Sequence, residues 1–86
     1  MFYFYVLRSS KDNKLYFGST KDLRRRLSEH ERGSVPSTKN RRPIVLVYYE
    51  AYRSKIDAIH REKQMKNYGK VWSQLKRRIE KSIHEI

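Results

Sequence analysis

Three consecutive arginines and one histidine in the stretch "LRRRLSEH" point to chemistry on an anion. The stretch is expected to be helical. Arg26 and His30 then share one flank of its inward side, because they are four residues apart. A planar guanidinium can hold two phosphate oxygens at once, so Arg26 is the candidate for a phosphate clamp. Arg24 and Arg25 point outward, and we expect them to be solvated charges that contact a nucleic-acid backbone non-specifically.

A carboxylate at position 62 stands where an apolar residue is expected. In a helix over residues 55–68, Glu62 falls on the same side as Ala58 and Met65, which is the side that should face the core. A buried carboxylate is costly unless it is paired, hydrogen-bonded or bound to a metal. Two interpretations stay open: an ion pair with an arginine of the first helix, and ligation of a hard cation such as Mg²⁺, which takes its other ligands from water and phosphates.

The N-terminal segments predict a hairpin that gathers tyrosine hydroxyls. Two strands, "FYFYVLRS" (2–9) and "LYFGS" (15–19), flank the turn residues "SKDNK" (10–14). With Asp12-Asn13 at the tip, odd positions of the first strand share a face with even positions of the second. One face is then purely apolar: Phe2, Phe4, Val6 and Phe17. The other carries three hydroxyls and one glycine: Tyr3, Tyr5, Tyr16 and Gly18.

The arginine-rich helix is bounded by recognisable end signals. It is expected over residues 22–32, with Asp22 or Thr20 as its cap and Gly33 just beyond its end. The polar loop that follows, 34–43, contains two prolines and three basic residues. We expect it to be the most mobile segment of the chain.

The second half of the chain predicts one strand and two helices. The strand spans 44–52, and a helix capped by Ser54 runs to about Tyr68, where Gly69 stops it. A final amphipathic helix is expected over about 70–85. Its apolar stripe is Trp72, Leu75, Ile79, Ile83 and Ile86. The order strand, strand, helix, strand, helix, helix predicts one α+β domain, residues 1–86, around a three-stranded sheet.

The excess of basic residues indicates a negatively charged partner. The 86 residues include 21 Lys and Arg against 9 Asp and Glu, a formal net charge of +12 and a sequence pI near 10.2. Nucleic acid is the first candidate partner and an anionic membrane surface the second, although the apolar runs are too short to span a bilayer. The chain has no cysteine, which excludes disulfides and thiolate metal sites and fits a reducing cytoplasm. No secretory signal is expected.

Four blocks, in order along the chain, resemble a known pattern. They are "YFYVL" (3–7), "LYFGST" (15–20), "DLRRRLSEH" (22–30) and "AIHREKQMK" (58–66). Together they resemble the GIY-YIG nuclease superfamily, and in particular its small standalone bacterial members, which are related to the N-terminal domain of the excision-repair nuclease subunit. The resemblance covers residues 2–69. It implies an α+β fold with a three-stranded antiparallel sheet flanked by helices.

The resemblance also implies roles for particular residues. Its two tyrosines, glycine, arginine, histidine and metal-binding glutamate fall on Tyr5, Tyr16, Gly18, Arg26, His30 and Glu62. Tyr3 and Phe17 replace a glycine and an isoleucine of the name motif. Ser19 stands where the excision-repair relatives carry a lysine, so a lysine-assisted step is not carried over.

The implied activity is metal-dependent hydrolysis of phosphodiester bonds in DNA. Glu62 would hold one Mg²⁺ or Mn²⁺, and Arg26 would stabilise charge on the phosphate. Tyr16, assisted by Tyr5 or His30, would position and deprotonate the attacking water. A tyrosine with a pKa of about 10 is a poor base at neutral pH, so the identity of the base stays open.

Further residues are expected to contact the nucleic acid: Gly18, Ser19, Lys21, Arg24, Arg25, Arg41 and Arg42. We expect DNA as substrate, a nucleoid-associated role in the cytoplasm connected with DNA repair, and a monomer or weak homodimer. One alternative is a non-catalytic nucleic-acid-binding module, either a degenerate nuclease or an RNA binder. Another is a ribosome-associated structural protein. Neither alternative requires an inward carboxylate.

Overall fold

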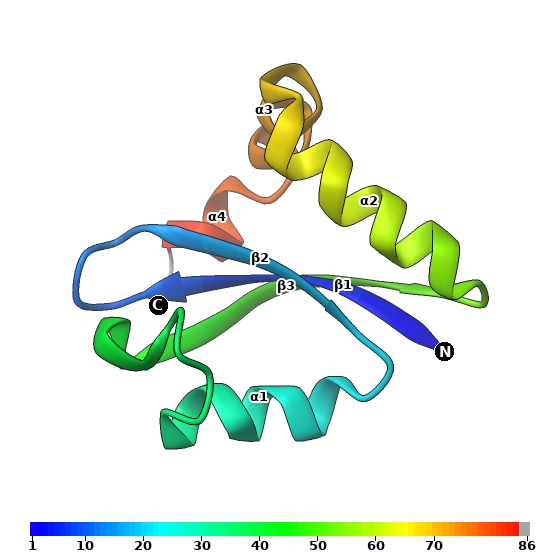
Figure 1. Ribbon diagram of the computed structural model, residues 1–86. Helices are drawn as coiled ribbons and strands as arrows, with labels where there is room; N and C mark the ends of the chain where they lie inside the picture. The colour runs from blue at the N-terminus through cyan, green and yellow to red at the C-terminus, as the bar shows by residue number, and fades with distance from the viewer. Residues whose placement is uncertain (85–86) are drawn as a thin grey trace.

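The computed structural model describes residues 1–84, and within them it contains one antiparallel sheet of three strands in the order β2-β1-β3 (Figure 1). The strands are β1 (Phe2–Ser9), β2 (Leu15–Thr20) and β3 (Ile44–Tyr52). Tyr5 lies opposite Gly18, and Leu7 lies opposite Tyr16. This register confirms the predicted hairpin and the division of its side chains between two faces.

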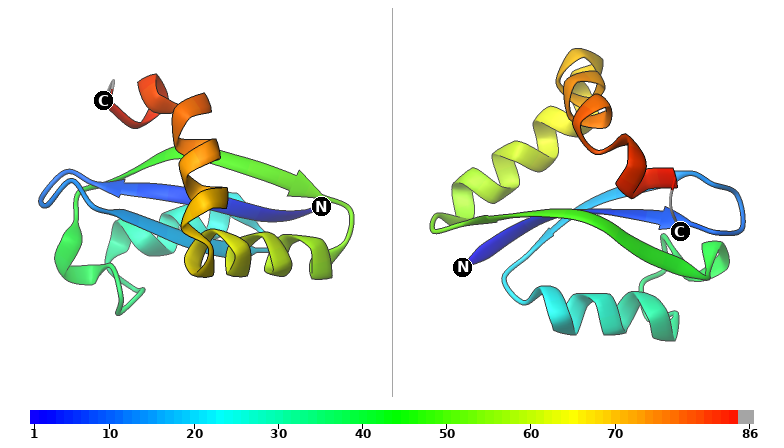
Figure 2. Two further views of the ribbon diagram at one scale, coloured as in Figure 1. Left: turned by 90° about the horizontal axis from the view of Figure 1, so that it is seen from above. Right: turned by 180° about the vertical axis from the view of Figure 1, so that it is seen from behind.

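Helices cover both faces of the sheet. They are α1 (Leu23–Arg32), α2 (Lys55–Asn67), α3 (Gly69–Arg78) and α4 (Glu80–His84), with a short 3₁₀ helix, η1 (Lys39–Arg41). Helix α1 lies on one face, and α2, α3 and α4 lie on the other, where α3 crosses over the strands (Figures 1 and 2). We call these the α1 face and the α2 face of the sheet. The α+β class and the antiparallel sheet are therefore as predicted.

The main apolar core lies on the α2 face. Phe4 and Val6 are fully buried there against Met65 of α2 and Leu75 of α3. Phe17 extends this core by an edge-to-face contact with Trp72, with ring centroids 5.1 Å apart. The apolar side of the hairpin is thus the side that gains most from removal from water. The polar side of the hairpin, which carries the tyrosine hydroxyls, faces α1.

Local end signals set the ends of α1. The Asp22 side chain accepts a hydrogen bond from the Arg25 backbone N–H at 3.0 Å, which identifies it as the cap. Gly33 adopts a left-handed conformation (φ 78°) and its N–H bonds to the carbonyls of Glu29 and His30. The helix therefore starts and stops where the sequence predicts, and this fixes which of its residues face the sheet.

The predicted C-terminal helix is wrong in two respects. Tyr68 has an extended backbone (φ −126°, ψ 98°) and separates α2 from α3, so Gly69 begins α3 instead of stopping α2. The expected continuous helix over 70–85 is broken at Ile79 (φ −118°, ψ 23°). The break lets α4 turn back onto the sheet and bury Ile83, which a straight rod about 24 Å long could not do. Ile86, the last residue of the predicted stripe, lies outside the described residues.

The loop over 34–43 is packed more closely than its composition suggests. Val35 and Thr38 are both buried, and η1 occupies part of the segment. The prolines and charges of the loop predict mobility, but they do not reveal that the side chains of Val35 and Thr38 pack beside α1.

In the described part of the chain, no helix combines the length and apolar character needed to cross a bilayer.

Candidate active site

The site is built around a close approach between Tyr5 and Gly18 on the α1 face. Tyr5 is buried, and its ring passes over the backbone of Gly18 on the neighbouring strand. A side chain at position 18 would overlap the hydroxyl and ring of Tyr5. Gly18 is therefore present because the phenol needs the space, not because the backbone adopts an unusual angle.

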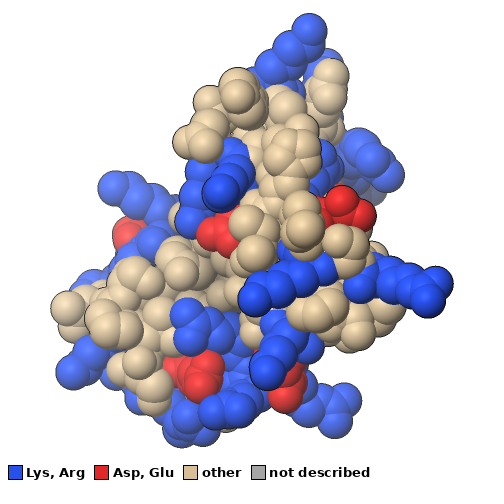
Figure 3. All heavy atoms as spheres, turned by 45° about the vertical axis from the view of Figure 1, so that its right-hand side comes forward, with Lys and Arg blue, Asp and Glu red and all other residues tan. Residues whose placement is uncertain are grey.

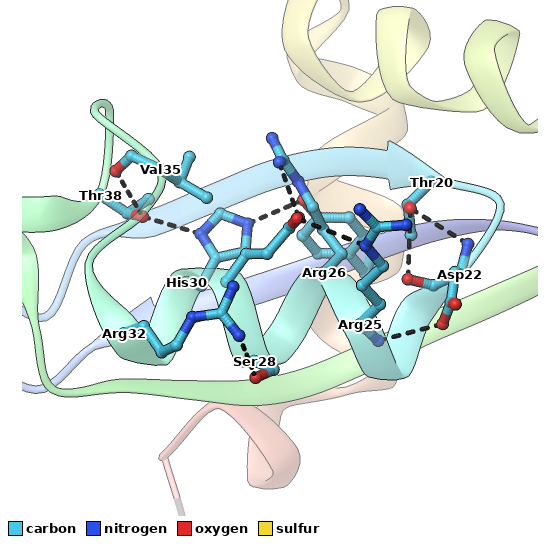
Figure 4. Close-up of polar contacts among 11 residues, drawn as sticks. Thr20, Asp22, Arg25, Arg26, Ser28, His30, Arg32, Val35 and Thr38 are labelled. Atoms are coloured by element: carbon cyan, nitrogen blue, oxygen red, sulfur yellow. Dashed lines mark hydrogen bonds and ion pairs between the residues drawn. The ribbon is translucent and has the colours of Figure 1, made fainter.

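A chain of hydrogen bonds runs from Tyr5 into the loop. The Tyr5 hydroxyl lies 2.9 Å from His30 Nε2, and His30 Nδ1 lies 2.7 Å from Thr38 Oγ1. His30 is on α1 and faces Thr38 in Figure 4. The Thr38 hydroxyl donates to the Val35 carbonyl at 3.5 Å, which leaves its oxygen free to accept from His30 Nδ1–H. His30 Nε2 then accepts from the Tyr5 hydroxyl.

Tyr16 completes a cluster of three rings. Its ring centroid is 5.3 Å from that of His30 and 6.4 Å from that of Tyr5. The Tyr16–His30 contact is edge-to-face. Unlike Tyr5, Tyr16 is only partly buried, so of the two phenols it is the one nearer to solvent.

Arg26 extends from α1 toward β2, on the side of the helix that carries His30 (Figure 4). Its Nη1 lies 3.2 Å from Glu29 Oε1, and Arg25 Nε lies 3.6 Å from Glu29 Oε2. About a third of the Arg26 side chain is exposed. Glu29 therefore holds the guanidinium in place while leaving it accessible to an anion in the adjoining hollow of about 240 Å³.

Burial and charge define the protonation states of this cluster. Burial raises the pKa of Tyr5 to about 12, although the neighbouring Arg26 guanidinium acts in the opposite direction. Burial also lowers the pKa of His30, and the positive charge of Arg26 lowers it further. At neutral pH, Tyr5 is therefore a protonated phenol and His30 a neutral imidazole. Tyr5 is not a base in this state, whereas His30 can accept a proton.

Glu62 comes from α2, on the opposite face of the sheet, and reaches the same strand edge. Its Oε1 accepts a hydrogen bond from the Ser19 hydroxyl at 2.6 Å, and its Oε2 lies 2.6 Å from Lys66 Nζ. Of the two open interpretations, the ion pair with an arginine of the first helix is wrong, because Glu62 pairs with a lysine one turn along its own helix. Its negative charge still acts on Tyr5, whose pKa it helps to raise, so the two groups are electrostatic neighbours across Gly18 and Ser19.

A second ion pair orients α2. Arg61, the residue before Glu62, makes two hydrogen bonds to Glu50 of β3, at 2.9 and 3.1 Å. Glu50 also accepts from the hydroxyls of Tyr48 and Tyr52. Burial raises the pKa of Glu50, but these hydrogen bonds outweigh it and hold the pKa below its usual value. Arg61 thereby attaches α2 to β3, while Glu62 attaches it to β2.

The donor set at Glu62 fits a hard cation that is mostly hydrated. Within residues 1–84 there is no group of three His, Asp or Glu side chains able to hold a metal. Glu62 and the Ser19 hydroxyl offer oxygen atoms, which Mg²⁺ and Mn²⁺ prefer. A cation here would take its other ligands from water and from substrate oxygens, and Lys66 would have to release Glu62.

The predicted nucleic-acid contacts fall into two groups. Gly18, Ser19, Lys21, Arg24 and Arg25 lie in or next to the hollows around the start of α1. Arg41 and Arg42 lie elsewhere and are engaged within the protein. Arg41 pairs with Asp12 of the hairpin turn at 3.4 Å, and Arg42 bonds to the Glu31 carbonyl at the far end of α1. The structure therefore does not bring these two arginines to the site.

Sequence reasoning missed three residues that contact the candidate side chains: Glu29, Thr38 and Lys66. Helical spacing could have found two of them, because Glu29 stands three and four residues after Arg26 and Arg25, and Lys66 stands four residues after Glu62. Thr38 could not have been found, because it lies in a loop whose path the sequence pattern does not predict.

The fold and the candidate site define a small α+β domain in which an accessible guanidinium lies beside two phenols and a neutral imidazole. Comparison with known proteins identifies its family. Residues 1–76 match the family model described as the GIY-YIG catalytic domain. The chain therefore belongs to the GIY-YIG family.

Similar curated proteins are small bacterial proteins. The chain is 41% identical over 69 residues to a UPF0213 protein of Staphylococcus haemolyticus, covering 79% of this chain and 83% of that one. It is 46% identical over 66 residues to a UPF0213 protein of Pediococcus pentosaceus, covering 76% and 68%. A UPF0213 protein of Staphylococcus aureus is 43% identical over 65 residues, covering 74% and 78%. No solved structure matches the chain.

The contact between Tyr5 and Gly18 predicts a strong difference between two glycine substitutions. Gly18→Ala should lower the free energy of unfolding by about 1–3 kcal/mol, because Tyr5 has to move. Gly69→Ala is the matched control: nothing lies within 4 Å of a methyl group there, and the helical position should gain up to about 1 kcal/mol. Urea unfolding measures both. Equal stabilities for the two variants would contradict the close approach.

The lowered pKa of His30 predicts a loss of stability in mild acid. The unfolded chain, with a histidine pKa of about 6.5, binds the proton more readily than the folded chain. The His30 contribution is therefore constant above that value and is lost as the pH falls from it toward the folded pKa. Unfolding free energies at pH 7.5 and pH 5.5 should differ less in His30→Gln than in the parent chain. An equal difference in both would rule out a buried neutral imidazole.

Proposed function

We propose that this chain is a metal-dependent endonuclease that hydrolyses phosphodiester bonds of DNA. The observation that supports it best is the hydrogen-bonded series Tyr5–His30–Thr38 beside an accessible Arg26, with Glu62 acting on Tyr5 from the other side of Gly18. A protein that only binds nucleic acid needs positive charge, but it does not need a buried proton-accepting imidazole. The choice of DNA rests on the resemblance to the family.

In this proposal, Arg26 binds the scissile phosphate. A phosphate oxygen replaces Glu29 as the partner of its guanidinium, and the positive charge stabilises the additional negative charge that develops on the phosphoryl oxygens. Arg25 and Lys21 line the same hollow and hold the adjoining backbone. In this arrangement the scissile phosphate lies between α1 and the edge strand β2.

The side chains of Tyr5, Tyr16 and His30 orient the attacking water and accept its proton. Tyr16, the more exposed phenol, orients the water toward phosphorus. The proton of the water passes to the Tyr5 hydroxyl as Tyr5 donates its own to His30 Nε2, so the imidazole is the final acceptor. A P–O bond forms to the water oxygen, and the bond to the leaving oxygen of the sugar breaks.

Glu62 and Ser19 would hold the divalent cation next to this phosphate. When bound, a cation at this position supplies Lewis acidity that stabilises charge on the leaving oxygen. The bond between Ser19 and Glu62 keeps one carboxylate oxygen oriented toward β2. Arg61 prevents α2 from rotating, which keeps Glu62 on the side of the strand edge.

Removal of the Arg26 guanidinium should reduce cleavage much more than binding. Arg26→Ala is expected to slow nicking of supercoiled DNA by about 10²–10³-fold, the range for loss of one group that stabilises transition-state charge. Arg32→Ala removes the same charge from an exposed position of the same helix and serves as the control. Binding at matched salt should weaken equally in both variants. Equal cleavage by both variants, or no cleavage by the parent chain on supercoiled, linear, single-stranded or branched DNA, would refute the proposal.

Lys66 should compete with the divalent cation for Glu62. Its ammonium lies 2.6 Å from Glu62 Oε2, so Lys66→Met is expected to tighten Mn²⁺ binding severalfold in isothermal titration calorimetry. Lys63→Met removes an equal charge from an exposed position of α2 and should leave Mn²⁺ affinity closer to that of the parent. Glu62→Gln should abolish binding at this site. If Glu62→Gln binds Mn²⁺ as tightly as the parent, the metal is held elsewhere.

A further inference from the structure

An open groove lies beside α1 and is larger than the hollow at Arg26, from which it is distinct. It encloses about 550 Å³ between the first two turns of α1 and the sheet. Its walls combine two aromatic rings, two aliphatic side chains, two cations and one carboxylate: Tyr3, Tyr49, Leu23, Leu27, Lys21, Arg24 and Asp22. None of the catalytic roles proposed above uses the aromatic part of this groove.

The two tyrosines form an aromatic platform that faces water. Tyr3 and Tyr49 meet edge-to-face, with centroids 6.0 Å apart and an interplanar angle of 64°. Tyr49 is 52% exposed, although it lies in the middle of β3. A large ring left half in water, beside the aliphatic side chains of Leu23 and Leu27, is suited to bind a flat apolar surface. The platform therefore fits a planar ligand.

The charges of the groove favour a ligand that carries negative charge, because two cations line it against one carboxylate, and that carboxylate, Asp22, is engaged as the cap of α1. Lys21 and Arg24 lie at its rim, and lysine and arginine side chains also cover much of the molecular face in Figure 3. A nucleotide has both features, because its planar base is attached to a phosphate. Aromatic side chains beside a basic groove are the usual means of holding single-stranded nucleic acid.

Lys21 connects the groove to the candidate active site. It lines this groove, the hollow with Arg25 and Arg26, and a third hollow next to Ser19, the residue bonded to Glu62. A strand whose phosphate lies at Arg26 can therefore continue past Lys21 around the start of α1 and into the groove. The continuity makes the aromatic platform part of the same substrate path.

We infer that the groove is a nucleobase subsite, in which an unpaired base near the bound phosphate stacks on Tyr49. Bases in an intact duplex are stacked on one another and cannot present their faces to a protein ring. The subsite therefore selects nucleic acids with unpaired nucleotides next to the cleavage point, such as single strands, overhangs or flaps. This inference rests on the proposed function for the position of the phosphate.

Binding to a single-stranded oligonucleotide that carries one 2-aminopurine tests the inference. The experiment uses the full chain in EDTA at fixed salt, so it does not depend on cleavage. Tyr49→Ala should weaken single-strand binding about fivefold or more, as loss of one stacked base predicts, and should abolish quenching of 2-aminopurine fluorescence. Tyr49→Phe should retain both. Binding of a duplex of the same sequence should change little in any variant.

Tyr68→Ala is the matched control, because Tyr68 is also a largely exposed tyrosine (62%) but lies at the junction of α2 and α3. It should bind the single strand like the parent. If Tyr49→Ala and Tyr68→Ala bind equally, or if Tyr49→Ala weakens duplex and single strand alike, the subsite does not exist. If cleavage depends on Arg26 but Tyr49→Ala does not change single-strand binding, only this inference is overturned. If single-strand binding depends on Tyr49 but the parent chain cleaves no DNA, only the nuclease proposal is overturned.

Discussion

The position of the Tyr5 phenol over Gly18 determines how the rest of the cluster is arranged. The ring can lie there only because the neighbouring strand has no side chain at that position. From there its hydroxyl reaches His30 on α1, and His30 in turn holds Thr38 in the loop. One close approach within a hairpin thereby connects the sheet, a helix and a loop. Burial of these groups then keeps the phenol protonated and the imidazole neutral.

Strand β2 is the element where the two faces of the sheet meet. It is an edge strand, so groups from α1 and α2 can approach one another around it without passing through the core. Consecutive residues serve opposite faces, since Gly18 receives Tyr5 and Ser19 binds Glu62. The pairing of Arg61 with Glu50 secures the other side of α2 to β3. The carboxylate is therefore positioned by two strands that lie on either side of β1.

The charges of the candidate site are paired within the protein. Arg26 pairs with Glu29, and Glu62 pairs with Lys66, each with a partner on its own helix, and the two cations are more exposed than the two carboxylates. In the proposed reaction, a phosphate would take the place of Glu29 at Arg26, and a divalent cation would take the place of Lys66 at Glu62. The excess positive charge of the whole chain then favours a polyanion over any neutral ligand.

The sequence alone determined the hairpin and its two faces, the limits of α1, the α+β class and the candidates Arg26, His30 and Glu62, because periodicity, turn residues and helix caps act over a few residues. It also showed that a carboxylate faces inward at position 62. Only the tertiary structure decided which groups from distant segments touch these side chains: Ser19 at Glu62, Thr38 at His30, and internal partners for Arg41 and Arg42. The break at Ile79 also appears only in the tertiary structure, where α4 beyond it contacts β3 and buries Ile83. Contacts between segments distant in the chain depend on packing, which a local pattern does not encode.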